Sequence, residues 1–580
     1  MTKRLIALLL SLIMVLACFA GCNQKDDVSE IVDEGSERTA TLSMYLMSEE
    51  EVSAEQALAI QNAVNKITKS KFKTQLVLRY FTEDQYYTAL EKAFEATANS
   101  EDFEDDFSNA LKGELAGETA AEETYIDEYG VIQLKYPTIT DYQVDIFYLS
   151  GYDKLAQYIE NDWVYELSDE IGSASKVLKT FINPGFLNGI DTVCNGTYAV
   201  PGNSPIGEYT YILVNKEILK EYNHVASDFT SILSSTSQYL LDHVSKYNTE
   251  FVPLRSFTES GELDVSYIRY FGIDENGHFD DSNFSLLGSA YDRNWTYLTS
   301  GQYSRCASIF NDTDFLEQLE TLVEYKEKGY YGTDADADKK FAMGYIKGGA
   351  EVYEQYGDEY EIIVHKAPEL STMDVFENMF AVGSMSQLDR SMEIITYLYS
   401  NTDFANLLLY GIEGENYELV DSDVLDSKGN PLPQVKRLAN NTYVMAPEKI
   451  GNMLLAYPTL DQDPNIREIY KQQNLDSSVS LVMGMMHNFD EMPLSFEHTT
   501  YLREQSEIVL NDLLAIETVE ALNEYTVNIR KTLNSDTMLV EAMRQASISA
   551  GVDENGEPLD PLQTLPAVYT AWLTANKILN

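Results

Sequence analysis

The chain has 580 residues, of which 44% are hydrophobic and 23% are charged, so it carries enough apolar material for more than one sizeable core. This composition excludes a disordered chain and a small disulfide-stabilised domain. Forty basic and 94 acidic residues give a formal net charge of −54, which repels phosphate backbones and anionic lipid headgroups. Nucleic acid and an electrostatically bound membrane surface are therefore poor candidates for partners.

The N-terminal residues are typical of a secretion signal. A short basic head precedes the almost wholly apolar residues 5–17, a stretch too short for a comfortable membrane span. It ends in FAGC, which resembles the bacterial lipobox, in which the cysteine, here Cys22, receives a diacylglycerol. We expect residues 1–21 to be a lipoprotein signal peptide, Cys22 to be lipidated, and the polar residues 22–40 to form a tether. An ordinary signal peptide that leaves Cys22 as a free thiol is the alternative.

Strand and helix patterns alternate over the next segment. Residues 41–47 predict a strand, and a capping box that begins at Ser53 predicts a helix with apolar residues at 3-4-3 spacing. The apolar residues 75–81 predict a second strand, which a second helix follows as far as residue 98. This order is typical of a parallel sheet with crossover helices.

Residues 101–128 interrupt the pattern. They contain eleven acidic residues and one basic residue, and we expect a solvated or partly disordered insertion. A buried strand is then predicted over 144–149, followed by an amphipathic helix. The dipeptide Asn195-Gly196 predicts a hairpin turn, and the Pro- and Gly-rich residues after it, 201–205, are typical of a crossing between domains. Further elements are expected later: strands over 361–365 and 376–382, and helices over 314–327, 388–399, 402–410 and 501–532.

The motifs of common catalytic and metal sites are absent from the sequence. No two of the six histidines are four residues apart, and there is no HExxH, paired CxxC, GxSxG or P-loop motif. Residues 334–338 resemble the start of a calcium loop, but Lys339 stands where that loop needs glycine. Beyond Cys22 the mature chain has Cys194 and Cys306. Two cysteines in so large a chain do not make a disulfide framework, and we expect both to be buried thiols. We expect neither metal nor cofactor.

Three stretches carry a resemblance to a known family. They are VDIFYLSGYDKLAQYIENDWVYEL from residue 144, GTYAVPGNSPIGEYTYILVNKEIL from residue 196, and FAVGSMSQLDRSMEIITYLYSNTDFANLLLYGIEG from residue 380. With the lipobox and the strand–helix order before them, they resemble the extracellular solute-binding proteins of family 1, the carbohydrate-capturing lipoproteins of bacterial ABC importers. The resemblance covers roughly residues 40–460.

The resemblance implies an α/β fold of the two-lobed periplasmic-binding-protein type (type II), with a hinge between the lobes and a helical C-terminal region. The implied divisions are lobe 1 over 41–205 with the insertion 101–128, lobe 2 over 206–375, a return to lobe 1 over 376–455, and a mainly helical part over 456–580 that packs on lobe 2.

The resemblance also implies where a ligand binds. Ligands of open parallel sheets lie at the carboxyl ends of the strands. Asp153 follows the third predicted strand, where relatives commonly place a sugar-binding acid, although a helix N-cap is an equal alternative. Glu208 matches a position that often faces the ligand, with a solvated strand residue as the alternative. The other candidates, each of which packing would also explain, are Tyr45, Glu49, Tyr152, Tyr209 and Trp295.

The expected function is capture of a carbohydrate, an oligosaccharide, and its delivery to ABC permease subunits without catalysis. We expect a monomer held by its lipid on the extracellular face of the cell membrane, and Asn23 after the lipidated cysteine favours a Gram-positive envelope. Two alternatives stay open. The same fold could bind a peptide or a cationic solute, as the negative charge suggests, or the chain could be a surface glycoside hydrolase or adhesion lipoprotein, since the separation of paired carboxylates is spatial.

Overall fold

The computed structural model describes the residues 39–98, 124–126, 132–134, 143–256, 268–270, 272–273, 279–280, 284–290, 307–333, 336, 338–349, 351–439, 441, 443–479 and 496–535. The expected signal peptide, the lipidation site Cys22, most of the tether, Trp295 and Cys306 lie outside the described residues. So does the acidic insertion apart from strand β3 (Thr124–Ile126).

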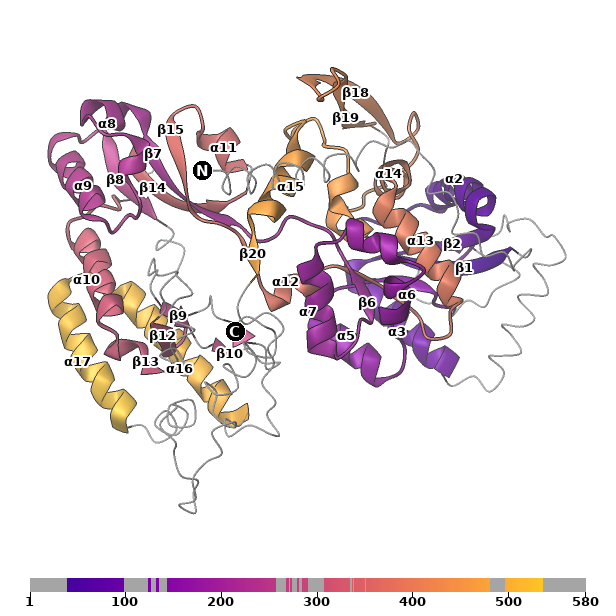
Figure 1. The fold of residues 1–580 in the computed structure, drawn as a ribbon, viewed down its shortest axis with the longest axis horizontal. Helices are drawn as coiled ribbons and strands as arrows, with labels where there is room; N and C mark the ends of the chain where they lie inside the picture. Colours follow the sequence, from indigo (N-terminus) through magenta and orange to yellow (C-terminus); the bar gives the residue numbers. More distant parts are fainter. Residues whose placement is uncertain are drawn as a thin grey trace, which may run out of the picture.

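A five-stranded sheet with the order β2-β1-β5-β17-β6 forms the centre of the first lobe (Figure 1). Its strands are β1 (Ala40–Ser48), β2 (Thr74–Thr82), β5 (Ile146–Leu149), β6 (Ala199–Pro201) and β17 (Met379–Val382). β1 pairs in parallel with β2 and β5, whereas β17 runs antiparallel to β5 and β6. β1 is buried along its whole length, as a strand covered on both faces must be.

The helices of the first lobe cover both faces of this sheet. They are α2 (Ala54–Phe72), α3 (Glu83–Ala98), α5 (Tyr152–Glu160), α6 (Ser168–Gly172), α7 (Pro184–Cys194), α12 (Thr372–Phe376), α13 (Leu388–Ser400) and α14 (Thr402–Tyr410). The helix predicted from the capping box is confirmed, because the Ser53 side chain accepts a hydrogen bond from the Gln56 amide at 3.3 Å. Phe94 of α3 packs edge-on against Phe147 of β5, with ring centroids 5.3 Å apart, and joins α3 to the sheet.

Two local predictions are wrong. Asn195-Gly196 forms no hairpin: Asn195 is the C-cap of α7, with a left-handed φ of 51°, and its amide donates to the Asp191 carbonyl. Hairpin turns and helix C-caps both need left-handed backbone, so this dipeptide does not distinguish them. The strand predicted over 376–382 begins only at Met379, because α12 and its capping-box residue Ser371 occupy the residues before it.

The second lobe has a four-stranded sheet with the order β15-β7-β14-β8. Its strands are β7 (Tyr209–Asn215), β8 (Phe251–Ser256), β14 (Lys340–Gly348) and β15 (Tyr360–Lys366). One face packs on α8 (Lys216–Glu221), α9 (Ser235–Tyr247) and α10 (Thr313–Glu327), and the other on the short helix α11 (Glu351–Tyr356). Each lobe therefore has a core of its own.

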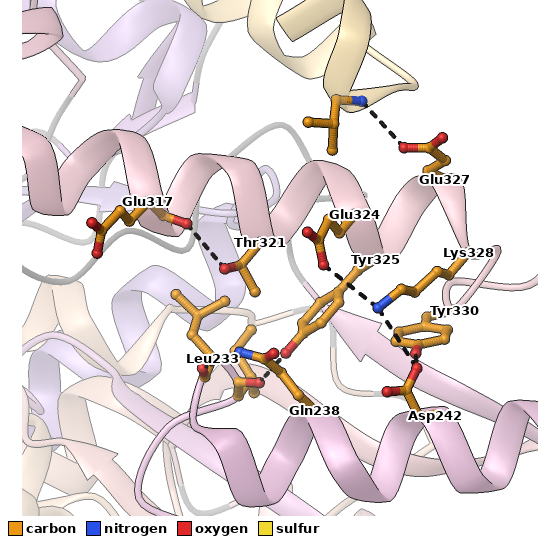
Figure 2. A network of polar contacts seen from close by, with 12 residues as sticks. Leu233, Gln238, Asp242, Glu317, Thr321, Glu324, Tyr325, Glu327, Lys328 and Tyr330 are labelled. Carbon is orange, nitrogen blue, oxygen red and sulfur yellow. Dashed lines mark hydrogen bonds and ion pairs between the residues drawn. The ribbon is translucent and has the colours of Figure 1, made fainter. Parts of the chain in front are cut away.

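The C-terminal helices α16 (Phe496–Ala515) and α17 (Val519–Ser535) belong to the second-lobe side, where α10 packs on α17. Figure 2 shows α10 between its partners. Lys328, just after α10, lies 3.6 Å from the Asp242 carboxylate of α9, which also accepts a hydrogen bond from Tyr330. On the other side the Val519 amide donates to Glu327 at 3.2 Å. These contacts hold α17 to α9 through α10.

The smaller elements complete the described chain. They are β4 (Ile132–Leu134), β9 (Ile268–Tyr270), β10 (Gly272–Ile273), β11 (Phe279–Asp280), β12 (Leu287–Ala290), β13 (Ala307–Ser308), β16 (Glu369–Leu370), β18 (Tyr417–Leu425), β19 (Pro431–Arg437), β20 (Ser478–Val479), α15 (Ile466–Asp476) and the 3-10 helices η1 (Lys176–Thr180), η2 (Ala226–Asp228), η5 (Ile309–Asn311), η7 (Pro447–Ile450) and η8 (Met453–Leu455). No described helix is both long and apolar enough to cross a membrane.

Candidate functional site

Four strands of the first-lobe sheet end at one edge. β1, β2 and β5 are parallel, and β6 shares their direction because β17 is antiparallel to both β5 and β6. β17 therefore begins where the other four strands end. This is the edge where parallel sheets bind ligands. We call it the carboxyl edge; it comprises Ser48–Glu49, Ser150–Asp153, Gly202–Asn203 and, where β17 begins, Glu377–Asn378.

Two neighbouring tyrosines of α3 hold the carboxyl edge together. The buried Tyr86 hydroxyl lies 2.8 Å from the Tyr148 carbonyl and 3.2 Å from the Tyr45 carbonyl, so it joins β5 to β1. The Tyr87 hydroxyl accepts a hydrogen bond from the Ser150 amide at 3.0 Å. Burial raises the pKa of Tyr87 to about 12, so this hydroxyl stays protonated at neutral pH. The hydrogen bond from Ser150 to Tyr87 thus holds the turn after β5 against α3.

Asn378 and Glu377 put an amide donor and a carboxylate on consecutive residues at the carboxyl edge. The Tyr148 hydroxyl donates to Asn378 Oδ1 at 2.7 Å, which orients the amide and leaves its Nδ2 with no partner among the described residues. The Gly202 amide donates to the Asn378 carbonyl at 2.5 Å. Glu377 is exposed, yet the surrounding protein partly desolvates its carboxyl and raises the pKa, and Asp374 adds repulsion.

Glu49 and Asp153 both lie at the carboxyl edge, but the surroundings of their carboxylates differ. Glu49 Oε1 lies 2.7 Å from Lys449 Nζ, and the Glu49 amide donates to the Val444 carbonyl at 3.0 Å. Asp153 is exposed in the first turn of α5, and its carboxylate has no hydrogen-bond or ion-pair partner among the described residues. The N-cap of α5 is Gly151, at a φ of 93°, so the alternative reading of Asp153 as the cap does not hold.

The two first-lobe tyrosines differ in what they offer a ligand. The Tyr45 side chain is only 2% exposed, and its ring stacks on Phe81 with centroids 5.8 Å apart, so in this arrangement it presents no face to solvent. β1 is covered on both faces, which is why a ring near its end is still in the core. Tyr152 is half-buried at the start of α5 and packs edge-on against Phe376 at 5.3 Å.

The remaining candidates lie on the crossing between the lobes. The Glu208 side chain is exposed and has no hydrogen-bond or ion-pair partner among the described residues. The Tyr209 hydroxyl donates to Asp476 Oδ2 of α15 at 2.7 Å, and its ring stacks on Tyr211 with centroids 5.2 Å apart. The polar end of Tyr209 is therefore already bound within the protein. The described residues contain no cluster of three or more His, Cys, Asp or Glu side chains that could hold a metal ion.

Several of these residues were not found from the sequence, for a spatial reason. Asn378 meets Tyr148 across 230 positions of the chain, and Lys449 meets Glu49 across 400. No local pattern marks such pairs. The tyrosine pair 86–87 was detectable as two rings in the first turn of a predicted helix, but nothing in the sequence shows which strand ends they reach.

The comparisons with known proteins concern the chain as a whole. No protein-family model matches it. A carbohydrate ABC transporter substrate-binding protein of Streptococcus pneumoniae serotype 4 is 22% identical over 351 residues, which is 56% of this chain and 67% of the relative. The crystal structure of the N-glycan transport solute-binding protein NgtS from Streptococcus pneumoniae matches with a TM-score of 0.54 and 15% identity, over 93% of this chain and 100% of NgtS. An extracellular solute-binding protein from Bifidobacterium longum subsp. infantis matches with a TM-score of 0.44 and 12% identity, over 94% of this chain and 99% of that one.

These findings bear on the fold predicted from the sequence. Two sheets, each with its own core, and a first-lobe sheet completed by a strand from the later chain agree with the resemblance. The predicted two-lobed α/β class is confirmed by the match to NgtS. The chain therefore has the fold of the extracellular solute-binding proteins of bacterial ABC importers.

Proposed function

We propose that this protein is an extracellular substrate-binding lipoprotein that captures a carbohydrate, an oligosaccharide, for an ABC importer. The fold supports this, as do the names of two similar proteins, a carbohydrate ABC transporter substrate-binding protein and an N-glycan transport protein. The observation that carries the proposal is the pair Asn378 and Glu377 at the carboxyl edge, an oriented amide donor and an exposed carboxylate on consecutive residues.

The chemistry of this pair suits sugar hydroxyls. A hydroxyl both donates and accepts, so vicinal hydroxyls are matched by an acceptor and a donor side by side. Glu377 accepts with two oxygens, and the free Nδ2 of Asn378 donates. Asp153 supplies a second carboxylate at the carboxyl edge, and the preceding residue, Tyr152, packs its ring against Phe376 at the start of the same helix. A few convergent polar groups with an aromatic neighbour are typical of small-molecule sites.

The crossing residue Glu208 extends the proposed site toward the second lobe. Closure of the lobes on a ligand follows from the higher affinity of the closed arrangement, so binding is a shift between populations. Nothing in this site needs a metal or a cofactor. We propose that no reaction is catalysed, which agrees with similar proteins that are named for binding.

The place of action is part of the same proposal. Lipidation at Cys22 would hold the protein on the extracellular face of the membrane, with a Gram-positive envelope favoured, and residues 22–40 would be the tether. The captured sugar would pass to permease subunits, and the protein would act as a monomer.

A cationic solute is the second candidate, for one specific reason. Burial chiefly raises the pKa of Tyr148 above its ordinary range, and the negative charges of Glu83 and Glu448 add to the effect. The carboxylates of Glu83, Glu448 and Glu377 together give the carboxyl edge a negative potential, which would favour an amine or a cationic peptide.

A thermal-shift screen tests the proposal. The full chain is heated with neutral oligosaccharides, amino sugars and cationic peptides, because a ligand that binds only the native state raises the melting temperature. We expect a neutral oligosaccharide to raise it, and Glu377→Gln to weaken the effect. Glu418→Gln, on the exposed strand β18, is the matched control and should change nothing. A shift with cationic peptides alone would favour the second candidate.

A further inference from the structure

Three segments lie between the two lobes in the described part of the chain (Figure 1). Residues 202–208 run from β6 to β7, and residues 367–371 run from β15 to α12. The third segment, residues 466–479, comprises α15 and β20. β20 pairs in parallel with β16 of the second segment, and the Ser478 amide donates to the Pro368 carbonyl at 3.0 Å. The second and third segments are therefore bound to each other.

Two side chains of α15 hold the first segment by its backbone. Asn474 Oδ1 accepts from the Ile206 amide at 2.8 Å, and its Nδ2 donates to the Ser204 carbonyl at 2.9 Å. Gln473 Nε2 donates to the carbonyls of Ile206 at 3.0 Å and Gly207 at 2.6 Å. The Gln473 side chain is 3% exposed, so these bonds are shielded from competing water.

The two ends of α15 contact different lobes. Near its N-terminus, Arg467 Nε donates to the Leu454 carbonyl at 3.1 Å, on the first-lobe side. At its C-terminus, Asp476 accepts from Tyr209, the first residue of the second-lobe strand β7, at 2.7 Å. The helix thus bridges the lobes and also fixes the segment that runs between them.

We propose that Gln473 and Asn474 are positioning residues for ligand capture. They bind the first connecting segment to α15 and so restrict the arrangements that the two lobes adopt before ligand arrives. This inference rests on the proposed function and adds to it the residues that govern lobe motion.

The physical reason lies in how hinges move. Rotation of one lobe against the other is absorbed by φ and ψ changes in a few connecting residues. In residues 202–208 the bonds to α15 oppose such changes, and Gly207 has little free space: at a φ of 47°, its Cβ position would lie 3.2 Å from the Glu369 carbonyl. Without these bonds the lobes would sample more arrangements. A ligand that requires one of them would then bind less tightly, because binding must order the hinge first.

The chain offers a matched control for this idea. Asn406 also binds backbone at both ends of its amide: Nδ2 donates to the Leu455 carbonyl at 2.9 Å, and Oδ1 accepts from the Tyr457 amide at 2.9 Å. It is 1% exposed and lies within the first lobe. Asn406→Leu therefore removes the same kind of bonds as Asn474→Leu and leaves the bonds between α15 and residues 202–208 intact.

The test measures interlobe distances and affinity separately. Nitroxide labels are placed on the exposed residues Gln157 of α5 and Ser245 of α9, in a full chain whose native cysteines are replaced, and their distance distribution is recorded by pulsed electron resonance without ligand. We expect Asn474→Leu to widen the distribution relative to Asn406→Leu. The affinity for an oligosaccharide that binds the parent should fall about tenfold in the first variant only.

Each outcome decides the inference. Equal widths in the two variants overturn it, and so does a wider distribution with unchanged affinity. Gln473→Leu is the second variant and should behave like Asn474→Leu even if the latter folds poorly. If no oligosaccharide binds the parent, the proposed function fails, whereas the distance distributions still decide whether α15 restricts the lobes.

Discussion

Asp145, just before β5, is a carboxyl group buried at 0% exposure in the first-lobe core. Its Oδ2 accepts from the Ser43 amide at 2.8 Å and from Gln143 Nε2 at 2.6 Å, and the Ser386 hydroxyl also interacts with the carboxyl group. Burial raises the pKa of Asp145 to about 6, against the opposing effects of these hydrogen bonds and of the positive charge of Arg79. Because the pKa of this carboxyl group differs between the folded and unfolded states, the free energy of unfolding should depend on pH.

The shift in the pKa of Asp145 on folding sets the sign and the size of this pH dependence. Because the folded pKa of Asp145 lies above its ordinary value of 3.8, the folded state binds the proton more tightly than the unfolded state. The associated stability is fully present below pH 3.8 and is lost as pH rises through about 6. A shift of about two units corresponds to about 3 kcal/mol in the free energy of unfolding.

Asp145→Asn removes this titration with little change in shape. The amide oxygen can still accept from Ser43 and Gln143, and the cost of burying the amide nitrogen does not change with pH, so it drops out of the pH dependence. We expect the unfolding free energy of the variant, relative to the parent, to rise by about 3 kcal/mol between pH 4 and pH 7.

Denaturant unfolding of both proteins at pH 4, 5, 6 and 7, followed by circular dichroism, measures the difference directly. Other carboxyls titrate in the same range, but they cancel when variant and parent are compared. A difference between Asp145→Asn and the parent that stays constant across this range would refute the reasoning.

Three further predictions concern the first lobe. Tyr87→Phe leaves the Ser150 amide without its acceptor and should weaken ligand affinity by about 1 kcal/mol in calorimetry, with the fold intact; unchanged affinity would contradict the positioning role. Gly202→Ala places a Cβ 2.9 Å from a backbone oxygen and should cost about 1–3 kcal/mol in denaturant unfolding, whereas Gly172→Ala, with open space around it, should be neutral. Burial raises the pKa of Cys194 to about 12, so mass spectrometry should find this thiol unmodified by iodoacetamide at pH 8 until the protein is unfolded.

The fold was largely predictable because its signals are local. The strands over 41–47 and 75–81 and the helix after Ser53 follow from periodicity and a capping box, and the structure has them as β1, β2 and α2. The order of these elements in turn predicts parallel pairing, which β1 and β2 show. The hairpin predicted at Asn195-Gly196 was wrong because the left-handed conformation that Asn195 adopts occurs at helix ends as well as in hairpins.

The candidate site was predictable only in part. The position of Glu49 and Asp153 at the carboxyl edge could be predicted because each comes shortly after a strand, and the strand ends of a parallel sheet share an edge. Tyr45 was misleading, since its position near a strand end does not show that the strand is covered on both faces. Asn378 was missed because its orientation depends on Tyr148, far away in the chain.

Titration calorimetry of the full chain with neutral oligosaccharides tests the central claim most directly. The account predicts a saturable one-to-one association with at least one of them, weakened when Asn378→Ala removes the amide that Tyr148 orients. Heat from cationic peptides alone, or binding of an oligosaccharide that Asn378→Ala leaves unchanged, would contradict it.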